Sequence, residues 1–153
     1  RYGLVGSEMC IRDRSTSIGA ADITEVEMVT TTADKSEGFT ISVRVRYNEP
    51  VDVVTTGGTP TLAVTNSNAG SGSGRGPHSL SYASGTGTNE LIFSLAIAAA
   101  NAATNADDVL TVGAQTIALN SGTIKDASGT ASDAALVISG AVGTAAGSVT
   151  VTA

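Results

Sequence analysis

The chain has 153 residues, with 14 acidic and 8 basic side chains and a net charge of −6 at pH 7. An acidic surface repels phosphate groups, so the composition argues against nucleic acid or anionic membranes as partners. No run approaches the roughly 18 apolar residues that a membrane-spanning helix needs. The length suits one domain with a single core, and the abundance of Thr and Val favours strands over helices.

The first segment, Leu4–Arg14, reads LVGSEMCIRDR. Codons can be assigned to it that reproduce the transposase adapter ligated onto DNA for short-read sequencing, and such agreement over ten consecutive codons is not expected by chance. We therefore interpret residues 1–14 as a non-native, disordered tail, with natural sequence from about Ser15 and its own N-terminus missing. Cys10, the only cysteine, lies in this tail, so we assign it no nucleophilic, metal-binding or disulfide role.

Two segments show the period-two alternation of a strand with one buried face. They are Phe39–Tyr47 and Glu90–Ile97, in which apolar residues fall on one face and polar residues on the other. Shorter strands are expected at Ile23–Val29, Val51–Val54, Thr61–Thr65, Leu80–Tyr82, Val109–Val112, Thr116–Leu119, Ala135–Ile138 and Val149–Thr152.

Clusters of Gly, Asn and Ser separate these segments. This spacing predicts an all-β, immunoglobulin-like antiparallel sandwich of seven to nine strands over residues 15–140. Its two sheets are expected to interlock through Phe39, Ile41, Val43, Val45, Leu62, Leu91, Phe93, Leu95, Leu119 and Ile138.

Three segments are expected outside these strands. Ala96–Ala106 is alanine-rich and helical by propensity, but it follows directly on a strand without an N-cap, so we expect a loop with one helical turn at most. Asn66–Gly76 has the composition of a flexible hairpin tip and lacks the Gly-Lys-Ser/Thr step of a phosphate-binding loop. Residues 141–153 are expected to form a linker and a terminal strand, which could begin a following domain.

Seven short pieces occur in a fixed order across Ala21–Ile138. They are Tyr47-Asn48-Glu49-Pro50-Val51, Gly58-Thr59-Pro60-Thr61-Leu62, Ser81-Tyr82-Ala83-Ser84-Gly85-Thr86-Gly87-Thr88-Asn89, Leu91-Ile92-Phe93, Asp107-Asp108-Val109-Leu110, Ala118-Leu119-Asn120 and Gly122-Thr123-Ile124-Lys125-Asp126. Together they resemble one copy of a bacterial immunoglobulin-like repeat, described as flagellar-system-associated, which occurs in tandem in large surface adhesins. Similar domains occur in structural proteins of marine phages. The resemblance implies an extracellular location, on a bacterial cell surface or a virion.

Some of these pieces have a physical explanation. Pro50 lacks a backbone donor, so it is expected at a strand edge or where a strand switches between sheets. Glu49 beside it is expected to place a charge on that edge, which discourages pairing with other chains. Positive φ angles in turns are expected at Gly85, Gly87, Asn89 and Gly122.

The sequence predicts no catalytic residues and no enzyme. His78, the only histidine, lies beside a glycine-rich segment and is expected to be a surface imidazole rather than the base of a nucleophile–histidine–carboxylate triad. Glu49 and Asp52 could form a pair of catalytic carboxylates, but their odd separation in a strand points them to opposite faces.

The remaining charged residues suggest an ion-paired surface and one metal alternative. Arg44 and Arg46 point outward from one strand and are expected to pair with Glu25 or Glu27. Asp107, Asp108 and Asp126 could supply oxygen ligands to calcium, although they lack the spacing of an EF-hand and adjacent acids are also typical of solvated turns. Our expectation is no metal and no cofactor, with calcium at these three residues as the alternative.

We therefore expect a non-catalytic spacer, structural or adhesion module of a larger extracellular surface protein or virion protein. Its expected partners are neighbouring copies of the same domain or other surface or virion proteins, with no nucleic acid and no membrane insertion. Two alternatives stay open. One is a glycan- or receptor-binding module that acts through loops at one end, although the chain lacks the Trp on which such modules often stack sugars. The other is an accessory domain of a secreted hydrolase.

Overall fold

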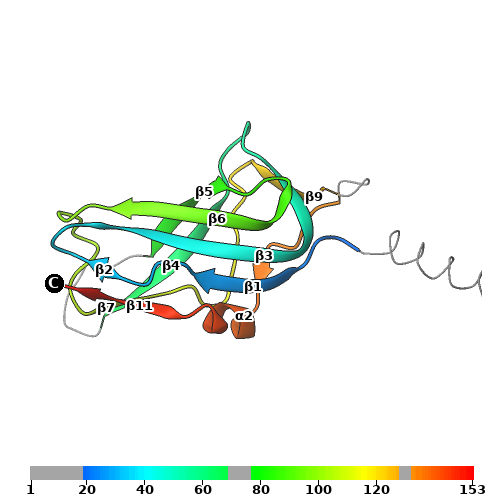
Figure 1. The fold of residues 1–153 in the computed structure, drawn as a ribbon. Helices are drawn as coiled ribbons and strands as arrows, with labels where there is room; N and C mark the ends of the chain where they lie inside the picture. The colour runs from blue at the N-terminus through cyan, green and yellow to red at the C-terminus, as the bar shows by residue number, and fades with distance from the viewer. Residues whose placement is uncertain (1–18, 69–76, 128–131) are drawn as a thin grey trace, which may run out of the picture.

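The computed structural model describes residues 19–68, 77–127 and 132–153 (Figure 1). The predicted adapter-derived tail with Cys10, and residues 69–76 of the predicted hairpin tip, lie outside these ranges.

The described strands are β1 (Ile23–Met28), β2 (Ala33–Asp34), β3 (Phe39–Val54), β4 (Thr61–Asn68), β5 (His78–Ser84), β6 (Thr88–Ile97), β7 (Asp108–Thr111), β8 (Gln115–Thr116), β9 (Thr123–Asp126), β10 (Val137–Ile138) and β11 (Ser148–Thr152). Eight of them have four or more residues, and the one described helix is α2 (Gly140–Ala145).

The strands form two layers, which confirms the predicted all-β sandwich. Their order is β1-β3-β6-β5-β4-β7-β11-β2, with β9 beside the end of β3. The first half of β4 pairs with β5 and its second half with β7, so β4 passes from one layer to the other. The layers β1-β3-β6-β5 and β4-β7-β11-β2 correspond to the two sheets of an immunoglobulin-type sandwich. The pair β2–β11 is parallel, whereas the other pairs are antiparallel.

β3 is the longest strand and shows why the sequence folds this way. Buried residues alternate with more exposed ones along it, without a break from Ile41 to Val51. The pairing with β6 is interrupted between Arg46 and Val51 and resumes where Val51 is opposite Thr88. On the other edge of β3, β1 pairs up to Tyr47 and β9 pairs from Val51 onward. Pro50 therefore lies where one edge of β3 changes partner from β1 to β9 within the same sheet, rather than at a switch between sheets, and a residue without an N–H costs least at such an interruption.

The space between the layers is filled by apolar side chains. Each of the ten predicted core residues is either fully buried or packed against the buried cluster. Tyr47 also lies in the core, where its hydroxyl donates to the carbonyl oxygen of Ala135 at 3.1 Å. Tyr82 and Phe93 meet edge to face, with ring centroids 6.1 Å apart, which adds a specific aromatic contact to the area burial.

The structure corrects two of the predicted turn positions. Gly85 and Gly87 have φ angles of +116° and +77°, as expected, whereas Asn89 lies within β6. In the turn before β9 the positive φ angles belong to Asn120 and Ser121 rather than to Gly122. A glycine is still required at position 122, because a Cβ there would lie 2.3 Å from a backbone oxygen of the neighbouring loop.

The C-terminal part of the chain completes this sandwich. β6 ends at Ile97, and residues 98–107 contain turns but no helix, as predicted. The expected linker instead contains α2, capped by the Ser139 hydroxyl, which accepts from the N–H of Val142. β11 then pairs with β7 and β2 of the same domain. Among the described residues, no helix has the length and apolar character needed to cross a membrane.

Leu91→Ala is expected to lower the free energy of unfolding by about 2–5 kcal/mol, because a fully buried leucine leaves a cavity between the sheets. Leu95→Ala is the matched control, since Leu95 is on the same face of β6 but only partly buried. Urea unfolding of both variants measures the difference. Equal losses would contradict the placement of the core.

Candidate functional site

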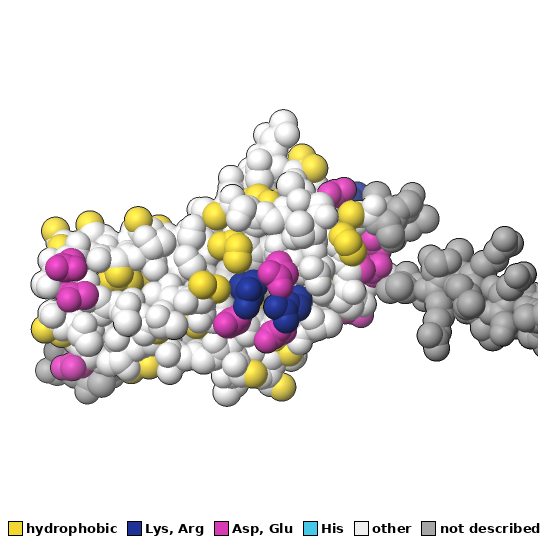
Figure 2. All heavy atoms as spheres, in the orientation of Figure 1, with side chains coloured by type: hydrophobic (Ala, Val, Ile, Leu, Met, Phe, Trp, Pro, Cys, Tyr) yellow, Lys and Arg dark blue, Asp and Glu magenta, His cyan; other side chains and the backbone are white. Residues whose placement is uncertain are grey.

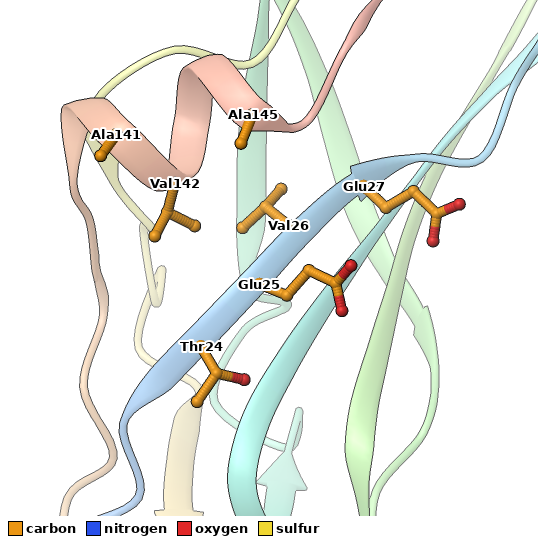
Figure 3. A pocket seen from close by; sticks show the side chains of 7 residues that line it. All are labelled: Thr24, Glu25, Val26, Glu27, Ala141, Val142 and Ala145. Carbon is orange, nitrogen blue, oxygen red and sulfur yellow. The ribbon is translucent and has the colours of Figure 1, made fainter.

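A groove of about 400 Å³ lies between β1 and α2. It is lined by Thr24, Glu25, Val26, Glu27, Ala141, Val142 and Ala145. Figure 3 shows the side chains of Val26 and Val142 in the space between strand and helix, while Glu25 and Glu27 project from the other side of β1. The groove therefore has an apolar interior and an acidic rim.

Two local features hold α2 beside β1. The backbone N–H of Met28 donates to the carbonyl oxygen of Ala146 at 2.8 Å, which joins the edge of β1 to the end of the helix. On its other side the helix approaches the loop before β8 so closely that a Cβ on Gly143 would lie 2.1 Å from the carbonyl oxygen of Gly113. A second hollow of about 350 Å³ lies there, and Thr144 is among its lining residues.

The outer face of the sheet next to the groove carries a network of ion pairs (Figure 2). Arg44 pairs with Glu27, and Arg46 pairs with Glu25 at 2.5 Å, as predicted. Sequence analysis missed Glu90, which lies 2.7 Å from Arg46 and 3.6 Å from Arg44. The strand register could have revealed it, because Glu90 is directly opposite Arg46 in the β3–β6 pair. Ion pairs on such a half-exposed surface contribute little stability singly but form a defined pattern of charge.

Glu49 is not the edge charge that the sequence predicted. Its residue is only 8% exposed, and among the described residues its Oε1 atom has no hydrogen-bond partner. Burial raises the pKa of the Glu49 carboxyl, and the nearby carboxylates of Asp126 and Asp22 raise it further. Asp52, by contrast, is exposed on the opposite face of β3, so the predicted separation of the two carboxylates is confirmed.

His78 is buried, which corrects the prediction of a surface imidazole. It is 6% exposed, and its Nε2 atom lies 2.9 Å from the hydroxyl oxygen of the fully buried Thr104. Burial lowers the pKa of His78, and the charge of Asp108 partly offsets this shift. Ser79 and Ser81 lie on the opposite, exposed face of β5, so neither forms a nucleophile–base pair with the imidazole.

The three acids proposed as calcium ligands do not come together. Asp107 is exposed, whereas Asp108 is fully buried and its Oδ2 atom accepts from the N–H of Asn105 at 2.8 Å. Asp126 lies in β9, opposite Val51, at the other end of the sandwich (Figure 1). Within the described ranges, no three side chains of His, Cys, Asp or Glu are grouped so that they could hold a metal ion.

Comparison with protein-family models, with curated proteins and with solved structures found no significant match. The four described aromatic side chains, Phe39, Tyr47, Tyr82 and Phe93, are buried or partly buried, so they provide no open platform for stacking a sugar ring. The β1–α2 groove and the adjoining charged surface remain as the candidate site.

Glu49→Gln is expected to raise the thermal unfolding midpoint at pH 7, because glutamine fills the same space without an ionised group in the interior. The pKa of Glu49 is raised in the folded state. The free energy of unfolding of the wild-type chain therefore falls as pH rises from the ordinary pKa through the raised one. The advantage of the variant should therefore vanish below the ordinary pKa of about 4.5. Thermal melts from pH 4 to pH 8 measure this difference. The exposed Glu37→Gln is the control, and a lower midpoint for Glu49→Gln at pH 7 would contradict the assignment.

His78 is expected to make the fold less stable as pH falls from 7.5 to 5.5. The unfolded chain takes up a proton near pH 6.5, while the lowered pKa of buried His78 resists protonation. The slope from this one group is at most about 1.4 kcal/mol per pH unit. Urea unfolding at several pH values should show that His78→Gln removes this part of the slope. An identical pH dependence in both proteins would show that His78 is not the titrating group.

Proposed function

We propose that this chain is a non-catalytic spacer module of a larger extracellular surface protein or virion protein. The observation that carries the proposal is the position of its chain ends. Asp22, before β1, exchanges hydrogen bonds with Asn48, close to Pro50. At the opposite end of the sandwich, the carbonyl oxygen of Thr152 accepts from the backbone N–H of Lys35. The described fold thus begins and ends at opposite poles of its long axis (Figure 1).

Chain ends at opposite poles suit a module that sets the distance between neighbouring domains and carries tensile force along a row of them. β3 runs between the two poles with 16 residues, roughly 50 Å of extended chain at about 3.3 Å per residue. A pull on the two ends acts along β1 and β11, and the hydrogen bonds of both strands to their neighbours run across that direction. Many bonds would then have to break together. The resemblance to tandem surface repeats agrees with this geometry.

End-to-end pulling of single molecules is expected to require a higher unfolding force than pulling from Ser36 and Ala153. Both of the latter lie at one pole, so the force would peel β11 away one bond at a time. The matched molecules differ only in the attachment points, with Cys10 replaced by Ser in each. Equal forces in the two geometries would remove the mechanical argument for a spacer.

The DNA that flanks the coding sequence provides a second test. Tandem copies of this domain would support an adhesin, and neighbouring tail or capsid genes would support a virion protein. A catalytic domain in the same reading frame would instead favour an accessory domain of a secreted hydrolase, and the proposed role would then be wrong.

A further inference from the structure

Two carboxyl groups lie inside the sandwich at the pole where the described chain begins. Glu49 on β3 is 8% exposed and Asp126 on β9 is 3% exposed. In the strand register Asp126 is opposite Val51, so it shares the inner face of the sheet with Glu49, two residues before Val51. Diagonal neighbours of this kind are within reach of a long side chain, and the two carboxyl groups lie within hydrogen-bond reach of each other.

One oxygen atom of this pair has no partner. The Oε1 atom of Glu49 is buried and accepts no hydrogen bond from any described residue. Buried polar atoms are normally satisfied by protein groups, by water or by an ion. Because Glu49 projects to the inner face of β3, a group that satisfies its Oε1 atom has to lie inside the sandwich, beside Asp126.

The described Lys and Arg side chains are engaged elsewhere. Arg44 and Arg46 pair with glutamates on the outer face of β3. Lys125 projects from the other face of β9 and lies 3.6 Å from Asp133. Lys35, at the opposite pole, donates to a backbone carbonyl oxygen. Of the described residues, none therefore brings a positive charge to the buried acids, and their repulsion has to be relieved by a bound proton or a bound cation.

The donor atoms select the kind of cation. Both side chains offer only oxygen, which suits a hard cation rather than a transition metal. Calcium takes about six to eight oxygen ligands in a flexible geometry that includes backbone carbonyls and waters, whereas magnesium demands a near-ideal octahedron. A pair of carboxylates completed by carbonyl oxygens and water therefore favours calcium. The exposed Asp22, whose charge also acts on Glu49, would draw a cation towards this pole.

We propose that Glu49 and Asp126 form the centre of a calcium site, in which the Oε1 atom of Glu49 is a direct ligand and a proton shared by the two carboxyl groups is the competing occupant. The ion would hold β9 against β3 just beyond the point where β1 ends its pairing with β3. The site uses two carboxylate side chains and excludes Asp107 and Asp108, which lie at the other end of the sandwich. It does not depend on the proposed spacer role.

The first test is a calorimetric titration of Ca²⁺ into the 153-residue chain at pH 8. We expect one saturable site with a Kd of roughly 10⁻⁴–10⁻³ M, the range of extracellular calcium modules. At about ten times the Kd, Ca²⁺ should raise the thermal unfolding midpoint by about 3–6 °C, because the ion binds only the folded state. Mg²⁺ at the same concentration should raise it by less than half as much, and NaCl at equal ionic strength controls for screening.

Matched variants separate the site from the general acidity of the chain. Glu49→Gln and Asp126→Asn should each weaken Ca²⁺ binding by about tenfold or more, because each removes a charged ligand. Asp52→Asn makes the same change of charge on the outer face of β3 and should leave the Kd within about twofold. With a chelator present, Glu49→Gln should still show its higher midpoint at pH 7, which distinguishes lost binding from lost folding.

Calcium and protons should compete for the pair. Carboxylate ligands bind metal only when ionised, so Ca²⁺ binding should weaken as pH falls through the raised pKa of Glu49. Titrations at pH 8 and pH 5 measure this change. Asp52→Asn should show the same pH dependence as the wild-type chain.

Three results would overturn the proposal. One is the absence of saturable Ca²⁺ binding at millimolar concentration, and a stability that still rises on acidification would then show that the pair holds only a proton. Another is equal Ca²⁺ affinity of the wild-type chain and Glu49→Gln. The third is equal weakening by Glu49→Gln and Asp52→Asn, which would show attraction to the overall negative charge alone.

Discussion

The alternation of side chains along β3 is the constraint on which the rest of the structure depends. Every second residue from Ile41 to Val51 is buried between the sheets, and the strand contacts β1, β6 and β9 on its two edges. A shift of one residue would exchange its faces and expose the whole apolar set. The same alternation places the side chains of Arg44 and Arg46 on the outer face, where they pair with the glutamates, and it buries Glu49 despite its charge.

Sequence periodicity predicted the sandwich because both long strands alternate cleanly and their turn residues lie between them. It failed where a residue's environment is set by a distant partner. His78 follows a glycine-rich run, which suggested exposure, but pairing opposite Val64 turns it inward toward Thr104. Its neighbour Pro50 suggested that Glu49 lies at an exposed edge, whereas the fold buries it beside Asp126, far along the chain. Local composition contains no information on such contacts.

The candidate site could be predicted only in part. Arg44 and Arg46 were expected to pair on the surface, since alternation fixes their face, but the register that adds Glu90 requires knowledge of which strands are neighbours. The helix α2 was missed because its six residues include two glycines and no charged side chain. Gly143 is unfavourable for an isolated helix, yet it permits the close approach to the loop at Gly113 on which the helix position depends.

The strand order begins with β1 and ends with β2, which are consecutive in the chain. After β1 pairs with β3 in one layer, the chain crosses over and β2 pairs with β11 in the other. The two layers are thus joined along one side by a single continuous segment of chain. Exposed strand edges serve as templates for amyloid-like stacking. The outer edge of β1 is in addition covered by α2, because the N–H of Met28 donates to Ala146 and Val26 is only 2% exposed. A domain with this edge covered can lie beside many identical neighbours at high local concentration without recruiting them into a shared sheet.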